Sequence, residues 1–232
     1  MALIKFGGGV AGISGKIGGT VFGRNKAGAY ARNWAKPVNP VTPSQSQVRS
    51  IFGNASAAWG ALIPAKRDVW NSYAATLERL NRFGEAYVPS GRQIFLESYN
   101  SNAQAGMAPL TDPIVGATPP PAAEGLVLTA TVTAGVLTAL GLAWTSPGSG
   151  SPQMLIIEAT PPRPDTKTNV NNEYRQIAVE PTDGSPAVLL ANYTSVFGNT
   201  ATVGDVIRIR VTTLDGETSL RSAAVLASDI VA

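Results

Sequence analysis

The chain has 232 residues with neither cysteine nor histidine, which excludes disulfides, zinc–thiolate sites, and catalysis by a Ser-His-Asp or Cys-His arrangement within the chain. Hydrophobic residues make up 44% and charged residues 14%, so the composition supports a folded core and excludes general disorder. No run of about 18 apolar residues occurs, so we expect no transmembrane helix. The glycines Gly7–Gly9 follow Met1–Phe6 directly, so we expect no signal peptide and a soluble product made in the cytoplasm.

Charge is divided unevenly along the chain. The first acidic residue is Asp68, and nine basic residues precede it: Lys5, Lys16, Arg24, Lys26, Arg32, Lys36, Arg49, Lys66 and Arg67. Residues 68–232 carry the other nine Lys and Arg and all 15 Asp and Glu, so the net charge of +3 divides into +9 before Asp68 and −6 from Asp68 onward. This asymmetry is typical of an arm that contacts a partner and is attached to an acidic globular body.

Residues 1–40 are predicted to form this basic, Gly-rich arm. Nine glycines fall within the first 28 positions. Ile13–Phe22 predicts short β-prone pieces interrupted by glycines. The segments Thr20–Gly23 and Ala29–Arg32 predict a hairpin with its turn at Asn25–Gly28. A lone hairpin has almost no core and is marginal in isolation, so we expect a partner to hold the arm in order.

Nine arm residues are predicted to bind the partner: Ile13, Lys16, Val21, Phe22, Arg24, Lys26, Tyr30, Arg32 and Trp34. Because the arm holds no acid, we expect Arg24, Lys26 and Arg32 to pair with acids on a partner or on another copy. Nucleic acid is the alternative, with cations on phosphates and Tyr30 and Trp34 stacking on bases. The cations are spread singly among glycines and small apolar residues, which favours a strand laid along another protein and makes nucleic acid unlikely.

The sequence predicts no catalytic, cofactor or metal site. Gly12–Lys16 lacks the spacing of a phosphate-binding loop, because Ile17 follows the lysine. The carboxylates are scattered along the chain with no pair spaced for shared acid–base chemistry. We expect five of these carboxylates to lie on the solvated surface of the C-terminal domain: Glu158, Asp165, Glu173, Glu180 and Asp183.

Residues 41–107 are predicted to be helical. Thr42–Gln45 forms a capping box with proline at the first helical position, Pro64 begins a second helix, and Ser90–Gln93 opens a third. The first helix carries an apolar stripe at three- and four-residue spacing: Val48, Ile51, Phe52, Ala55, Trp59 and Leu62. We expect Trp59 and Trp70 to pack between the first two helices.

Residues 108–123 are rich in proline and predict a semi-rigid linker. Residues 124–232 predict a β-sandwich, because short alternating runs are separated by turn residues. Seven strands are expected: Leu126–Thr133, Val136–Thr145, Gln153–Thr160, Tyr174–Glu180, Ala187–Ala191, Asp205–Thr213 and Ser219–Val225. Pro147–Pro152 and Leu214–Gly216 are predicted turns, and Pro161–Asn172 a long polar loop. Arg208 and Arg210 are expected on one face of their strand, with Ile207, Ile209 and Val211 on the other. The predicted fold class is therefore α+β and multidomain.

A set of residues spread over roughly residues 8–75 resembles an uncharacterised family of tailed-phage and prophage virion proteins. The matching positions are Gly12–Phe22, Asn25, Gly28, Tyr30, Arg32, Pro37–Pro43, Gln45, Arg49, Trp59, Arg67 and Trp70–Asn71. Ile63 departs from the pattern, since a helix-capping Ser or Thr is expected there. Residues 124–232 are similar to the fibronectin type III or immunoglobulin-like domains that are appended to phage capsid and tail proteins. Trp144 fits that pattern, while the usual tyrosine of the penultimate strand is replaced by Val206 and Ile207.

The resemblance implies a virion structural protein, synthesised in the host cytoplasm and assembled into the particle. The absence of histidine, cysteine and paired carboxylates favours a non-enzymatic role. A capsid decoration or cement protein is the first expectation. A tail or head–tail connector component and a receptor- or glycan-binding module are the alternatives. The expected partners are other virion proteins and copies of the chain itself, with no membrane and no cofactor.

Overall fold

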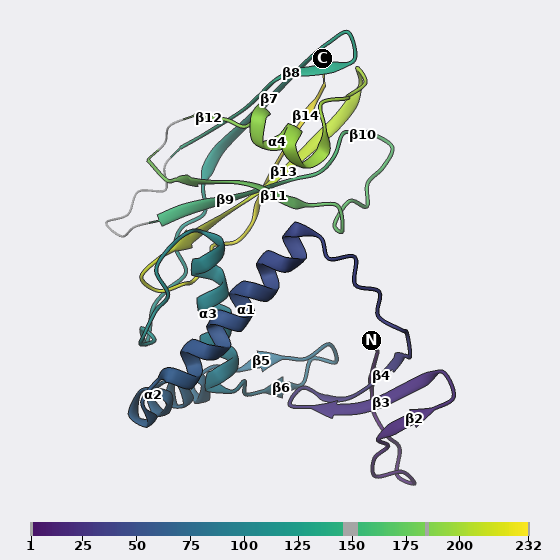
Figure 1. Cartoon of the computed structure of the whole chain (residues 1–232), viewed down its shortest axis with the longest axis vertical. Coiled ribbons are helices and arrows are strands. Elements are labelled where there is room, and N and C mark those ends of the chain that lie inside the picture. Colours follow the sequence, from purple (N-terminus) through teal and green to yellow (C-terminus); the bar gives the residue numbers. More distant parts are fainter. Residues whose placement is uncertain (1, 146–152, 184–185, 232) are drawn as a thin grey trace. The chain divides into compact units, whose positions relative to one another are not determined.

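The computed structural model describes residues 2–145, 153–183 and 186–231 (Figure 1). Within these residues the protein is α+β, with four helices and several antiparallel sheets. The chain divides into two compact units. The first unit comprises Met1–Asn100 and Thr111–Val115, and the second comprises Ser101–Leu110 and Gly116–Ala232.

The N-terminal residues form a four-stranded antiparallel sheet in the order β1-β4-β3-β2. Its strands are β1 (Ala2–Ile4), β2 (Gly15–Ile17), β3 (Thr20–Asn25) and β4 (Gly28–Asn33). The predicted hairpin is confirmed in β3 and β4, where Asn25 pairs with Gly28. Gly28 has φ of 122°, which glycine adopts without strain, and the Asn25 side chain accepts a hydrogen bond from the Ala27 amide at 3.0 Å. The edge strand β1 was not predicted, because three residues are too few for alternation to show. The edge strand β2 lies within Ile13–Phe22, which the sequence predicts to be β-prone.

Three helices follow in the order that the capping signals predict. They are α1 (Pro43–Ala61), α2 (Pro64–Ala75) and α3 (Gly91–Gln104). The Thr42 hydroxyl accepts the Gln45 amide at 3.3 Å, which confirms Thr42 as the N-cap of α1. The reciprocal bond of the predicted capping box is not formed, because the side-chain oxygen of Gln45 has no hydrogen-bond partner among the described residues. Ile63 precedes α2 and makes no side-chain cap. A short hairpin that was not predicted lies between α2 and α3 and is formed by β5 (Arg79–Leu80) and β6 (Ala86–Tyr87).

The aromatic residues of the helices meet on α3. Trp59 and Trp70 each lie against Phe95, with ring centroids 5.4 and 5.3 Å apart. The predicted packing between the first two helices was therefore wrong, because periodicity identifies the apolar face of a helix and not the neighbour that covers it. The Trp70 indole also donates a hydrogen bond to the Thr111 carbonyl at 3.0 Å, and Lys66 pairs with Asp112. These contacts hold Thr111–Val115 in the first unit.

The second unit contains two antiparallel sheets. One has the order β12-β8-β7, with β7 (Glu124–Thr133), β8 (Val136–Thr145) and β12 (Ala187–Val188). In the other, β13 (Asp205–Asp215) pairs with β9 (Gln153–Ala159), β10 (Arg163–Pro164) and β14 (Val225–Ile230), while β11 (Arg175–Pro181) pairs with β9. A short helix, α4 (Leu190–Phe197), precedes β13.

Three predictions about this region were wrong in detail. The last strand is Val225–Ile230 and not Ser219–Val225, because Asp215 extends the turn by accepting the amides of Glu217 and Thr218 at 2.8 and 3.3 Å. The predicted strand Ala187–Ala191 keeps only its first two residues before α4 begins. The predicted polar loop Pro161–Asn172 contains β10. The predicted turn Pro147–Pro152 lies outside the described residues.

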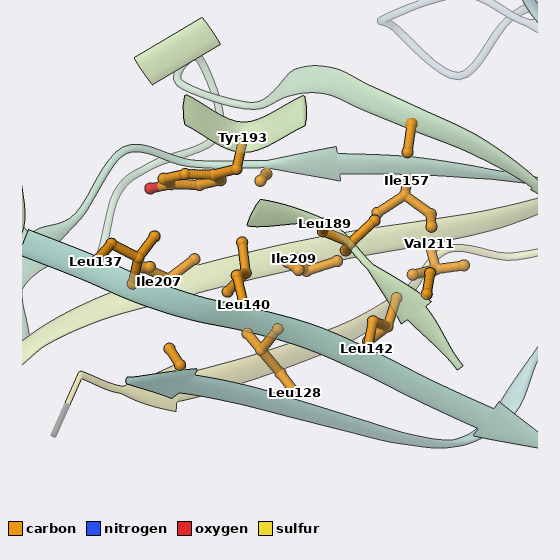
Figure 2. Packing of buried hydrophobic residues seen from close by; sticks show 14 of the residues in the cluster. Leu128, Leu137, Leu140, Leu142, Ile157, Leu189, Tyr193, Ile207, Ile209 and Val211 are labelled. Carbon is orange, nitrogen blue, oxygen red and sulfur yellow. The ribbon is translucent and has the colours of Figure 1, made fainter. Parts of the chain in front are cut away.

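Side chains from both sheets form one buried core (Figure 2). Ile207, Ile209 and Val211 are buried, while Arg208 and Arg210 lie on the opposite face of β13, so the predicted alternation is confirmed. Tyr193 of α4 is fully buried in the same core, and its hydroxyl donates to the Thr160 carbonyl at 2.9 Å. Burial raises the pKa of this phenol above its ordinary value.

Asn102 holds the end of α3 and the residues after it on the second unit. Its buried amide donates to the carbonyls of Ala108 and Gly216 at 2.8 and 3.0 Å, and its oxygen accepts from the Ser219 hydroxyl at 2.7 Å. A buried amide is costly unless its polar atoms are paired, and these three bonds pair them. The division between the two units therefore falls inside α3.

We expect Phe95→Ala to lower the free energy of unfolding of the first unit by about 3–5 kcal/mol, because it removes the ring shared by both tryptophans. Urea denaturation followed by tryptophan fluorescence measures the loss. Phe52→Ala is the matched control, since Phe52 is 51% exposed and its truncation should cost about 0.5 kcal/mol or less. Equal effects of the two substitutions would contradict the central role of Phe95.

We expect Tyr193→Phe to destabilise the second unit by about 1–3 kcal/mol, because the substitution leaves the Thr160 carbonyl without its donor. The midpoint of urea unfolding monitored by circular dichroism reports the change. Tyr174→Phe, which removes the hydroxyl of a half-buried tyrosine in the same unit, should change the free energy by about 0.5 kcal/mol or less. An unchanged midpoint for Tyr193→Phe would show that the hydroxyl contributes nothing.

Candidate functional site

The N-terminal sheet is regular but has no buried residue. Of the described residues, 2–40 are all exposed or partly exposed, and the first buried side chain in the chain is Ala55. Strand pairing alone is marginally stable in water, and sheets normally become stable by covering an apolar face. The strands of this sheet and the residues beside them contain the nine predicted partner-binding residues, and none of these nine is buried.

Strand register distributes the side chains over two faces. Directly paired residues share a face, and successive residues alternate. We name one side the Tyr30 face, which carries Leu3, Lys16, Val21, Tyr30, Arg32 and Trp34. We name the other side the Phe22 face, which carries Ile4, Ile17, Phe22, Arg24, Ala29 and Ala31.

Two contacts define the shape of the Tyr30 face. The Tyr30 ring lies across Gly23 on the neighbouring strand, where an added Cβ would come within 2.7 Å of the ring. Glycine is therefore required at this position for the ring to lie on the sheet. The Lys16 ammonium sits 4.2 Å from the centre of the Trp34 ring, a cation–π contact, and the Trp34 amide donates to the Gly19 carbonyl at 2.7 Å.

The structure brings together five of the nine predicted site residues and separates the rest. The Tyr30 face holds Lys16, Val21, Tyr30, Arg32 and Trp34. Phe22 and Arg24 lie on the opposite face, Lys26 lies in the hairpin turn, and Ile13 precedes β2. Within the described part of the chain, Arg24, Lys26 and Arg32 form no ion pair. Their pairing with acids on a partner remains a prediction.

The hairpin of β5 and β6 contacts the arm, which the sequence analysis missed. Lys5 pairs with Glu85 at 2.5 Å and lies 5.6 Å from the Phe83 ring, and the Asn81 amide donates to the Ala27 carbonyl at 3.0 Å. The hydrogen bond from Lys5, followed by one from Asn81, holds the pKa of the Glu85 carboxyl below its ordinary value. No local signal in the sequence connects residues this far apart.

Ion pairs on the second unit bind its carboxylates to neighbouring cations. Arg210 contacts Glu158 at 2.7 Å and lies 4.6 Å from the Tyr174 ring. Glu173 accepts hydrogen bonds from Lys167 and Arg163, which lower the pKa of its carboxyl. These carboxylates therefore make structural ion pairs at the surface. Among the residues that the structure describes, no three His, Cys, Asp or Glu side chains are grouped to hold a metal ion.

Two shallow grooves occur elsewhere. One, of about 440 Å³, lies beside α1 and α3 and is lined by Phe52, Ser90, Arg92, Gln93, Leu96, Glu97 and Asn100. The other, of about 460 Å³, lies beside α4 and is lined by Leu137, Leu190, Ala191, Thr194, Gly198 and Asn199. Neither brings together an acid–base pair. No helix in the described residues combines the length and the apolar character needed to cross a membrane.

Comparisons of the chain with protein-family models, with curated proteins and with solved structures found no match.

We expect Lys5→Gln to raise the titration midpoint of Glu85 toward its ordinary value, because the substitution removes the ammonium that stabilises the carboxylate. Since the folded-state pKa of Glu85 is lowered, its contribution to stability is present above the unfolded value of about 4.3 and is lost as the pH falls through the folded value. Carboxyl carbon NMR across the acid range measures the midpoint. A Glu85 midpoint that is identical in both proteins would show that Lys5 does not contact Glu85 in solution.

Proposed function

We propose that this chain is a non-enzymatic structural protein of a tailed-phage virion, most simply a capsid decoration or cement protein. In this proposal the N-terminal sheet anchors the chain in the particle, and the second unit forms the projecting domain. The observation that carries it is a four-stranded sheet with a complete antiparallel register and no buried residue. The resemblance of residues 8–75 to tailed-phage virion proteins supports the same assignment.

The N-terminal sheet has no buried residue that could stabilise it. Without a covered face, hydrogen-bonded strands of three to six residues gain little against the entropy of ordering them. The glycines around these strands increase that entropy cost. A protein surface that covers the sheet would supply the missing burial. Because no acid occurs before Asp68, every charged side chain that the sheet itself presents to such a partner is cationic.

We infer that the second unit is a sandwich of the immunoglobulin or fibronectin type III kind. Both β9 and β10 pair with β13, and we count β10 as the continuation of β9. The strands of the second unit then divide into the sheets β12-β8-β7 and β11-β9-β13-β14. Seven strands in sheets of three and four are the arrangement of these sandwiches. Trp144 of β8 is buried in the core. The hydroxyl of Tyr193 bonds to backbone as a tyrosine corner does, although it comes from α4 and not from the penultimate strand β13.

Cryo-electron microscopy of the intact particle tests where the protein sits. A decoration protein would be present in many copies on the shell, with the N-terminal sheet against the shell and the second unit outward. Density confined to the neck or tail tube would instead assign a connector or tail component. A few copies at the tail tip would favour a receptor- or glycan-binding module and would contradict the decoration role.

We expect deletion of residues 2–36 to leave a folded protein that no longer joins the particle, because none of these residues is buried in the described chain and the cores lie outside them. Copies per particle are counted by quantitative gel electrophoresis of purified virions, with full-length protein as the reference. Circular dichroism of the truncated protein verifies that the remainder is folded. Incorporation of the truncated protein at normal occupancy would assign anchoring to the helices or the second unit.

A further inference from the structure

We infer that the Tyr30 face, and not the Phe22 face, is the docking surface of the N-terminal sheet, and that its occupant is a virion protein surface combining carboxylates with apolar groups. This inference rests on the proposed function and extends it, since it identifies which side of the sheet is covered and the chemistry of the partner. Four of the five predicted site residues on this face are cationic or aromatic: Lys16, Tyr30, Arg32 and Trp34.

The residue types on the Tyr30 face are those that contribute most at protein interfaces. Trp, Tyr and Arg are the residues most enriched among interface hot spots, and this face places Tyr30, Arg32 and Trp34 along one side of β4 and its extension. Trp34 is 56% exposed, so most of its apolar surface is available for burial. Among the described residues, the Phe22 face carries one aromatic ring, the isoleucines Ile4 and Ile17 and small residues, and its one cation is Arg24.

The aromatic rings of the Tyr30 face are held in position before any partner binds. Tyr30 rests on Gly23, and Trp34 is held by the ammonium of Lys16 and by the hydrogen bond from its own amide to Gly19. Ordering a flexible side chain at an interface costs free energy, so rings that are already placed bind at a lower cost. No comparable ring or ion contact is formed by the described side chains of the Phe22 face.

Charge determines the chemistry of the occupant. Lys16 and Arg32 lie on this face, neither forms an ion pair within the described residues, and no acid occurs before Asp68. Carboxylates on the partner would neutralise these cations, whereas another basic surface would be repelled. One side of each aromatic ring is already in contact with the sheet, because Tyr30 lies on Gly23 and Trp34 lies against Lys16. The apolar side chains of Leu3 and Val21 lie on the same face. This mixture suits an acidic and apolar protein surface better than a strand of nucleic acid.

The test compares full-length variants that differ only in the face they alter. Arg32→Glu, Lys16→Glu and Trp34→Ala change the Tyr30 face, and Arg24→Glu is the matched charge reversal on the Phe22 face of the same sheet. Each purified protein is added to particles from a phage that carries an amber mutation in this gene. Bound protein is measured by co-sedimentation, and circular dichroism and thermal unfolding verify that each variant is folded.

We expect each Tyr30-face variant to weaken binding by at least about tenfold and Arg24→Glu to change it by about twofold or less. Binding of the unmodified chain should also weaken as salt is raised, because the pairs are ionic. Tyr30-face variants that bind normally, or Arg24→Glu as the weakest binder, would overturn the choice of face while leaving the anchoring role intact. Absence of binding by the unmodified chain would reject the proposed function itself.

Two further measurements with the same proteins identify a different occupant. In analytical ultracentrifugation, self-association that Arg32→Glu abolishes, together with unchanged particle binding, would assign the face to a second copy. Fluorescence anisotropy with a labelled oligothymidylate would assign it to nucleic acid if Arg32→Glu and Trp34→Ala remove oligonucleotide binding and spare particle binding. Either result overturns the inference, and an unmodified chain that neither self-associates nor binds the oligonucleotide supports it.

Discussion

Burial of alternate side chains along β13 is the constraint on which the second unit depends. This strand pairs with β9, β10 and β14, so its inward residues face the shared core while its outward residues face solvent and ion partners. Ile207, Ile209 and Val211 are each exposed by 1% or less. A shift of register by one residue would exchange these apolar side chains with Arg208 and Arg210, and the cost of burying two guanidinium groups holds the register in place.

The N-terminal sheet has the same hydrogen-bonding pattern without that constraint. Its strands alternate, pair and turn correctly, yet none of its residues is buried, so no core fixes its register. The two sheets therefore show that backbone pairing can specify which strands are neighbours, whereas burial of apolar side chains supplies most of the free energy that stabilises a sheet. This difference is also the reason why we propose the first sheet as the docking element, since a sheet without buried residues still has surface to contribute to a partner.

The candidate site could be predicted in composition but not in arrangement. Nine residues were selected because they are basic, aromatic or β-branched within a Gly-rich arm, and the hairpin that carries most of them followed from the turn at Asn25–Gly28. Which of them share a face depended on β2, whose three residues give no periodic signal. Only its pairing placed Lys16 beside Val21 and over the Trp34 ring. The salt bridge between Lys5 and Glu85 lay beyond any local pattern.

The sequence by itself determined the order and type of most elements, because capping residues, proline positions and alternation are local properties of the backbone. It determined the caps at Thr42 and Ser90, most of the longer strands of the C-terminal half and the inward side of β13. Tertiary structure alone decided that Trp59 and Trp70 meet on Phe95, that Asn102 joins the end of α3 to the second unit, and that α4 interrupts a strand-like run to bury Tyr193. Each of these outcomes depends on which surfaces meet across long separations in the chain, and local periodicity contains no information about that choice.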